Sequence, residues 1–123
     1  MTLLAATVAG GANATSDTFS KTVVAGGTLQ LSHYASVNMD CSSAGRPEVR
    51  IVTGPSSGAV RVVQGLGFSH FSNDYAPCSA RRVHGATVNH APEKGFLGSD
   101  TVQLDVVFPN GFERIDTYNI TVK

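Results

Sequence analysis

The sequence of 123 residues has little charge and no surplus of either sign. Nine Lys and Arg balance nine Asp and Glu, charged residues make up 15% of the chain, and tryptophan is absent. Binding to nucleic acid requires a basic surface that neutralises several phosphates. Arg81-Arg82 is the only basic pair in the chain. The composition therefore predicts no nucleic-acid partner, and the same shortage of basic clusters argues against an anionic membrane surface.

The sequence also lacks a long apolar run, so no segment approaches the roughly 20 residues of a membrane span. The first fourteen residues, "MTLLAATVAGGANA", contain a short apolar run and end in the small-x-small form of a signal-peptidase site. A basic start is missing from this segment. We interpret residues 1–14 as a truncated export signal cleaved after Ala14, with a disordered or strand-forming tail as the alternative. The expected location is therefore the periplasm or the outside of the cell.

No window of the sequence shows helical periodicity without an interrupting Gly or Pro, whereas alternation of apolar and polar residues recurs. We expect an all-β, immunoglobulin-like β-sandwich of about seven to eight antiparallel strands in one domain, residues 15–123. In the third strand, Val49 and Ile51 should face inward. In the last strand the apolar register shifts between Ile115 and Tyr118, which predicts a bulge or an edge segment. The expected strands lie at 19–24, 28–33, 48–53, 59–63, 83–89, 101–107 and 114–122.

The chain has only two cysteines, Cys41 and Cys78, and both lie in turn-like surroundings. In an exported protein an even number of cysteines favours a disulfide. Closing a loop of about 38 residues would stabilise the fold by roughly 4 kcal/mol. A pair of free thiols in a cytosolic protein is the competing interpretation.

Three segments of the chain resemble a known family. Pro55-Ser56-Ser57-Gly58-Ala59-Val60 resembles the "P-x-x-G-x-V" turn and strand of bacterial cadherin-like, immunoglobulin-like modules. The stretch "HAPEKGFLGSD", residues 90–100, is similar to their "Y-x-P-x-x-G-F-x-G-x-D-x-F-x-Y" signature, with His90 in place of the Tyr. Residues 116–122 resemble their terminal strand. The resemblance implies a non-enzymatic, extracytoplasmic module with a structural or adhesive role.

The glycines of "HAPEKGFLGSD" could in principle hold a phosphate, but such a loop opens a helix and here a strand follows. We therefore predict a structural turn. Pro92 should end one strand, Gly95 and Gly98 should permit a chain reversal, Phe96 should plug the end of the sandwich, and Asp100 should accept hydrogen bonds from turn amides.

Metal binding is the main alternative function. The sequence contains no zinc spacing of cysteine and histidine, no EF-hand and no Gly-x-Ser-x-Gly nucleophile elbow. His84 and His90 have even spacing, so an unbroken strand would place them on one face. A small periplasmic metal-binding protein that uses surface histidines is therefore the alternative, although no cofactor is expected.

A protein or cell-surface partner is the expected kind of ligand, and residues 64–80 are the expected contact region. Phe68, His70, Phe71 and Tyr75 lie there among Gly, Ser and Asn. Aromatic anchors beside small polar residues are typical of adaptable contact loops. The alternative is that Phe68 and Phe71 cap the core.

Overall fold

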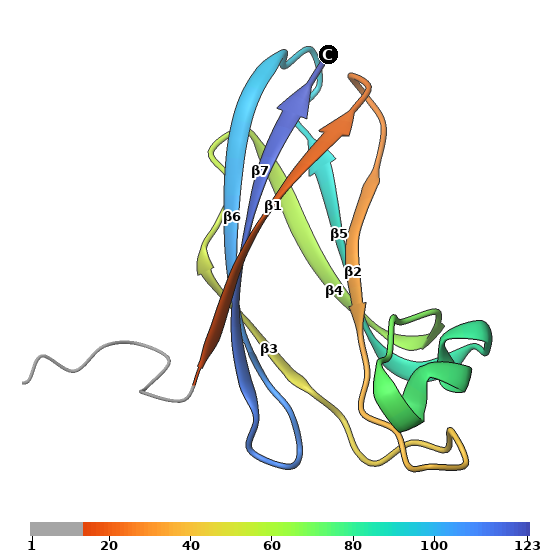
Figure 1. Cartoon of the computed structure of the whole chain (residues 1–123). Coiled ribbons are helices and arrows are strands. Elements are labelled where there is room, and N and C mark those ends of the chain that lie inside the picture. Colours follow the sequence, from red (N-terminus) through yellow and green to blue (C-terminus); the bar gives the residue numbers. More distant parts are fainter. Residues whose placement is uncertain (1–13) are drawn as a thin grey trace, which may run out of the picture.

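The computed structural model describes residues 14–123, which form two packed β-sheets and one short 3-10 helix (Figure 1). The expected export signal, residues 1–14, lies outside the described residues except for Ala14. The first strand begins at Thr15, where the domain was expected to start. The elements are β1 (Thr15–Val23), β2 (Leu29–Tyr34), β3 (Glu48–Thr53), β4 (Gly58–Gly67), η1 (Asn73–Ala80), β5 (Val83–Pro92), β6 (Gly98–Val107) and β7 (Glu113–Val122).

The seven strands divide into a four-stranded sheet, in the order β1-β7-β6-β3, and a three-stranded sheet, in the order β2-β5-β4. This confirms the predicted all-β sandwich. Not every pairing is antiparallel, however, because β1 runs parallel to β7 over its whole length. The chain crosses repeatedly between the sheets, which is the connectivity of immunoglobulin-like sandwiches. Strands β1 and β2 are edges on one side of the sandwich, and β3 and β4 are edges on the other.

The core lies between the sheets and follows the predicted alternation. Val102, Leu104 and Val106 of β6 are fully buried, and Ile120 and Val122 of β7 lie beside them. Alternation buries one face of each strand because successive side chains point to opposite sides.

The edge strand β3 shows how position limits burial. Val49 packs against the core as predicted, and Ile51 pairs with the buried Leu104. Ile51 nevertheless remains 46% exposed, because no further strand covers the open side of the sheet.

The predicted irregularity in the last strand is wrong. Strand β7 pairs without interruption with β1 and β6. Asp116 takes an inward position in the same alternating series as Tyr118, so a buried carboxylate interrupts the apolar pattern and the backbone stays regular. The bulges lie elsewhere, between Gln30 and Ser32 of β2 and between Ile51 and Thr53 of β3.

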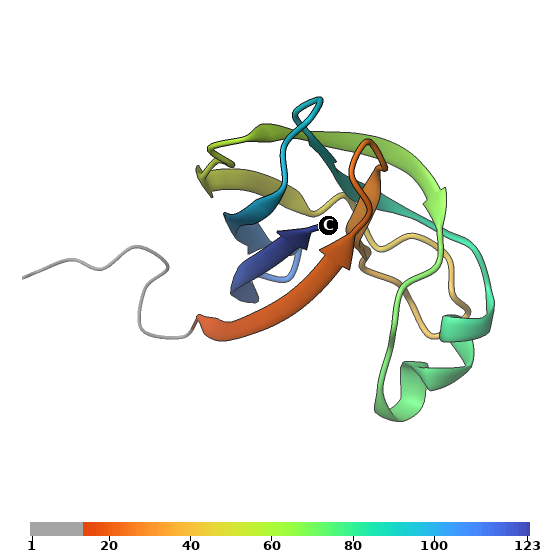
Figure 2. The same ribbon diagram turned by 90° about the horizontal axis from the view of Figure 1, so that it is seen from above.

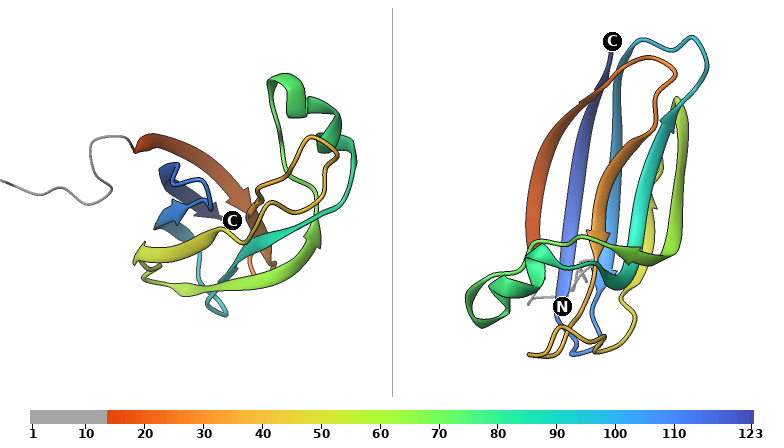
Figure 3. Two further views of the ribbon diagram at one scale, coloured as in Figure 1. Left: turned by 90° about the horizontal axis from the view of Figure 1, so that it is seen from below. Right: turned by 90° about the vertical axis from the view of Figure 1, so that its right-hand side faces the viewer.

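The middle of the chain is more ordered than its composition predicts. Strand β4 continues through Gln64 to Gly67, and residues 73–80 form the 3-10 helix η1, which was not expected. Figures 2 and 3 show η1 projecting beside the sandwich.

The connections gather at two ends of the sandwich. Residues 35–47, 68–82 and 108–112 join strands at the lower end in Figure 1, and we call these three connections the loop end. Residues 24–28, 54–57 and 93–97 join strands at the other end, which we call the turn end. Figure 3 shows the same separation from the side.

Candidate binding site at the loop end

The "HAPEKGFLGSD" segment lies at the turn end and holds two turns together. Strand β5 ends at Pro92, and Gly95 and Gly98 have φ of 81° and 133°, in the region that favours glycine. Phe96 packs against the core. The carboxylate of Asp100 accepts hydrogen bonds from the backbone N–H groups of Ser56, Ser57 and Thr101, at 2.8–2.9 Å.

The structure does not bring His84 and His90 together. His90 is completely buried, with Nε2 3.7 Å from Oδ2 of Asp100, so it is not the surface residue that the metal hypothesis requires. His84 is exposed six residues earlier, which is about 20 Å along a strand. His84 shares a small hollow with the cation Arg46. Among residues 14–123, no group of three or more His, Cys, Asp and Glu side chains is arranged to hold a metal ion.

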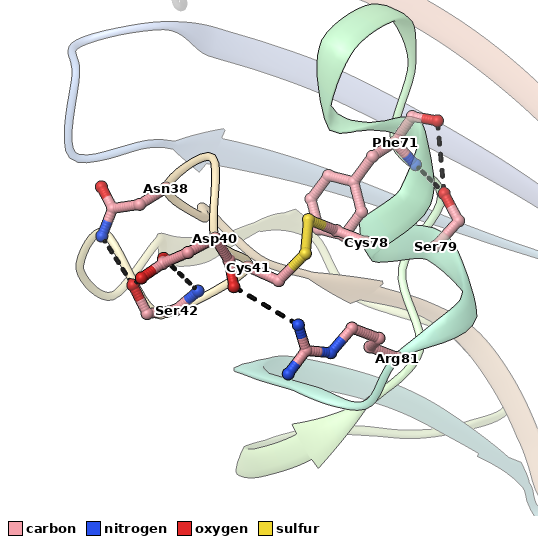
Figure 4. The surroundings of a disulfide bond; sticks show 8 residues. All are labelled: Asn38, Asp40, Cys41, Ser42, Phe71, Cys78, Ser79 and Arg81. Carbon is pink, nitrogen blue, oxygen red and sulfur yellow. Dashed lines mark hydrogen bonds between the residues drawn. A yellow bond between two sulfur atoms is a disulfide. The ribbon is translucent and has the colours of Figure 1, made fainter.

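At the loop end, the predicted disulfide joins two of the three connections. Cys41 in residues 35–47 is bonded to Cys78 in η1, with the two Cα atoms 5.4 Å apart (Figure 4). Cys78 is almost fully buried although the helix around it is exposed. The bond therefore anchors a projecting segment that has little other contact with the core.

Hydrogen bonds reinforce this anchor on both sides of the disulfide (Figure 4). The side chain of Ser42 and its backbone N–H both donate to Oδ1 of Asp40, and these bonds lower the pKa of Asp40. The backbone N–H of Phe71 donates to Oγ of Ser79 at 2.8 Å, which closes the 3-10 segment. Nη1 of Arg81 donates to the carbonyl of Asp40 and links the two loops again.

The four residues predicted to contact a partner all lie on the connection 68–82 or at its start. Phe68 is 58% exposed, and His70 and Tyr75 are also exposed, so the alternative of Phe68 as a cap of the core does not hold. Phe71 is half-buried. His70, Phe71 and Tyr75 line a shallow surface hollow together with Asn110 of the connection 108–112.

A larger cleft of about 510 Å³ opens on the β1–β2 side and reaches the loop end. Strands β1 and β2 are adjacent near their shared turn and separate toward the loop end (Figure 1). The cleft lies in that region, with β7 contributing part of its wall and His70 and Phe71 contributing to its rim. The volume falls within the range of about 300–1,000 Å³ typical of small-molecule sites.

A polar network forms the inner wall of this cleft. Oη of Tyr34 on β2 donates to Oδ2 of Asp116 on β7 at 2.6 Å and lies 2.9 Å from Oη of Tyr118, so the network bridges the two sheets. Arg114 donates to both carboxylate oxygens of Asp116, at 3.3 and 3.0 Å, and to Oδ2 of Asp17 on β1 at 2.9 Å. Asp17 and Asp116 are register partners on neighbouring strands. The guanidinium therefore neutralises two carboxylates that would otherwise repel each other.

The surroundings of the network keep its phenols protonated. Burial, followed by the hydrogen bond to Asp116, raises the pKa of Tyr34 well above its usual range, and burial also raises the pKa of Tyr118. The Tyr34 hydroxyl uses its single hydrogen to donate to Asp116. In the contact between the two phenols, the Tyr118 hydroxyl is therefore the donor and the Tyr34 oxygen the acceptor. Burial lowers the pKa of Arg114, but its bond to Asp116 and the nearby carboxylates outweigh this and raise it. The two phenols therefore act as hydrogen-bond donors in this network.

Sequence analysis missed these residues. The interrupted alternation at Asp116 was the signal for a buried carboxylate, but it was interpreted as a bulge. A second signal lies in β1, where the inward positions Asp17, Phe19 and Lys21 alternate polar and aromatic residues in place of aliphatic ones.

Comparison with known proteins shows little similarity. No model of a known protein family matches the chain, and no curated protein is similar to it in sequence. One solved structure with some likeness is a 2,6-sialyltransferase from Vibrionaceae Photobacterium sp. JT-ISH-224, in a ternary complex with CMP and lactose. The identity is 14% and the TM-score 0.39, over 89% of this chain and 18% of that chain. The chain thus spans less than a fifth of that enzyme's chain, and a likeness this low indicates neither a shared fold nor a shared activity.

Within residues 14–123, no helix combines the length and the apolar character needed to cross a membrane.

Proposed function

We propose that this chain is an exported, non-enzymatic, immunoglobulin-like module that binds a protein or cell-surface partner through its loop end. The observation that carries this proposal is the anchoring of exposed aromatic residues by a disulfide. Phe68 precedes η1 and Tyr75 belongs to it, and both are exposed. Phe112 and Met39 are exposed on the other two connections of the loop end. Aromatic residues and methionine are enriched at protein interfaces.

The physical argument for binding concerns entropy. An exposed loop that becomes ordered on binding loses conformational entropy, which weakens affinity. The Cys41–Cys78 bond and the hydrogen bonds around it restrict the loop before any partner arrives. A disulfide at this position also supports an extracytoplasmic location, because such bonds persist in oxidising compartments.

The resemblance to bacterial cadherin-like modules supports a structural or adhesive role. Its matching segments lie on the turn between β3 and β4, on the β5–β6 corner and on the end of β7. These segments belong mainly to the turn end and the core. The loop end is therefore free to differ between such modules, as binding loops on a rigid scaffold commonly do.

The proposal is tested by the binding of fluorescently labelled chain to intact cells, measured by flow cytometry. We expect the double variant Phe68→Ser, Tyr75→Ser to bind at least about tenfold more weakly, because exposed aromatic anchors dominate interface energies. Leu97→Ser is the matched control, since Leu97 is 66% exposed at the turn end. Equal binding by the double variant and the native chain, or an equal loss in Leu97→Ser, would refute the proposal.

A further inference from the structure

The inward-facing residues of β1 and β7 change from apolar to charged and aromatic toward the loop end. Near the turn end, inward positions of β1 and β7 carry Val23, Ile120 and Val122, all buried. Toward the loop end the same faces carry charged and aromatic residues, among them Asp17 and Asp116. Replacing a buried ion pair by apolar residues of similar volume is often neutral or stabilising. The polar network at this end is therefore weak evidence for a role in fold stability.

The charges that line the cleft cancel. Two acidic residues, Asp17 and Asp116, face two basic ones, Lys21 and Arg114. A strongly charged ligand would be repelled by two of these four side chains and attracted by the other two. The lining therefore favours a neutral ligand.

The lining presents a donor and an acceptor side by side. The bonds from Arg114 to the carboxylates use Nε and Nη2, which leaves the N–H groups of Nη1, and its side chain is 26% exposed. Asp17 accepts the Arg114 bond through Oδ2, and its side chain is 46% exposed. Adjacent hydroxyl groups of one molecule can donate to such a carboxylate and accept from such a guanidinium at the same time.

Aromatic rings lie next to this polar pair. Phe19 stacks on Tyr118 with 5.2 Å between the ring centroids, and both residues line the cleft. Phe71 and Phe108 line the cleft from the loop end. A ligand with hydroxyl groups on its edge and carbon-bound hydrogens on its face would match both parts of the lining.

We infer that the cleft between β1 and β2 binds a neutral saccharide unit, with Asp17 and Arg114 holding its hydroxyl groups and the aromatic rings packing against its face. The inference deepens the proposed function, because it names a cell-surface glycan as the partner and adds a pocket beside the contact loop. A short peptide added to the open edge of β1 or β2 is the competing occupant, and the peptide arm of the test below separates it from a saccharide.

The test is a titration of the isotope-labelled chain with the methyl glycosides of glucose, galactose, mannose and N-acetylglucosamine, followed by amide NMR shifts. Concentrations up to about 50 mM cover the millimolar affinities of a single sugar unit. At least one glycoside should shift the amides of Asp17, Lys21 and Arg114 while leaving β4 unchanged. Asp17→Asn should weaken that binding at least about tenfold, whereas Glu93→Gln, an exposed acidic residue at the turn end, should leave it unchanged.

Three results would overturn the saccharide assignment. These are no shift at the cleft with any glycoside, an affinity unchanged in Asp17→Asn, and shifts with the peptide Gly-Tyr-Gly where no glycoside acts. Arg114→Lys, which keeps the positive charge but removes the free Nη1 group, should weaken binding in the same way and serves as the second variant if Asp17→Asn does not retain native amide dispersion. The test is independent of the cell-binding assay: glycoside binding without cell binding leaves the cleft assignment standing and refutes only the proposed partner. Cell binding without glycoside binding leaves the proposed function standing and refutes the assignment of the cleft to a saccharide.

Discussion

Gly85 and Gly65 face each other in the β4–β5 pair but lie in different surroundings. A Cβ atom on Gly85 would lie 2.3 Å from the carbonyl oxygen of Tyr34 and 2.8 Å from Nε2 of His33, whereas a Cβ on Gly65 would meet nothing within 4 Å. His33 cannot easily move, because its two ring nitrogens contact Thr87 and the carbonyl of Val83. Gly85 is therefore required by the close approach of two strands.

We accordingly predict that Gly85→Ala lowers the free energy of unfolding by about 2–3 kcal/mol, as overpacking of a core does. Gly65→Ala should change it by less than about 0.5 kcal/mol. Urea denaturation of both variants provides the measurement. Equal stabilities would show that the β2–β5 contact adjusts to a side chain at position 85.

Asp100 provides a pH-dependent prediction. Burial raises the pKa of this carboxyl group, but three backbone N–H donors and His90 outweigh burial and lower it. Because the folded-state pKa lies below the unfolded value of about 3.9, the unfolded chain binds the proton more readily. The stabilisation is therefore complete above about pH 4–5 and is lost as the pH falls through the folded-state pKa.

Asp100→Asn should lower the stability at neutral pH by about 1–3 kcal/mol, because an ionised acceptor is replaced by a neutral one. The variant should also lose less stability than the native chain between about pH 5 and pH 2. Thermal unfolding at several pH values measures both effects, with Asp74→Asn, an exposed residue of η1, as the control. A variant whose acid sensitivity matched that of the native chain would contradict this role for Asp100.

Among the elements, the connections of the loop end depend most on covalent anchoring. The 3-10 helix η1 buries only Cys78, so little hydrophobic contact holds it against the sandwich. Segments with few buried contacts open at low free energy. The disulfide is therefore expected to set the order of residues 35–47 and 68–82.

Replacing Cys41 and Cys78 together by alanine should lower the free energy of unfolding by about 3–4 kcal/mol. Amide hydrogen exchange should accelerate first in the two connected loops, and the protection of β6 and β7 should fall only with the global stability. Chemical reduction of the native chain serves as the comparison. A uniform loss of protection across the molecule would indicate that the bond supports the core instead of the loop end.

Sequence patterns predicted strands but not the cleft, for physical reasons. Alternation identifies β3 at both ends and β2 and β6 to within three residues, because each strand must bury one face. The end of β4 contains two glycines and the helix η1 contains Pro77, so neither shows a clear period. Asp17 and Arg114 are almost 100 residues apart, and only the parallel pairing of β1 with β7 brings them together.

At the scale of the whole molecule, the proposed function gives the two ends different roles. The turn end carries Gly95, Gly98 and Asp100, whose backbone geometry and hydrogen bonds hold turns in place. The loop end carries exposed aromatic residues and the disulfide, and the polar cleft reaches it from the β1–β2 side. The account thus assigns structure to one end of the sandwich and recognition to the other.

Site-specific photo-cross-linking on intact cells tests this assignment most directly. A photoreactive phenylalanine analogue would be placed singly at positions 68 and 75 of the loop end and at positions 24 and 97 of the turn end, all exposed. The account predicts a covalent adduct with a cell-surface component from positions 68 and 75 and none from positions 24 and 97. Adducts formed equally from both ends, or only from the turn end, would contradict it.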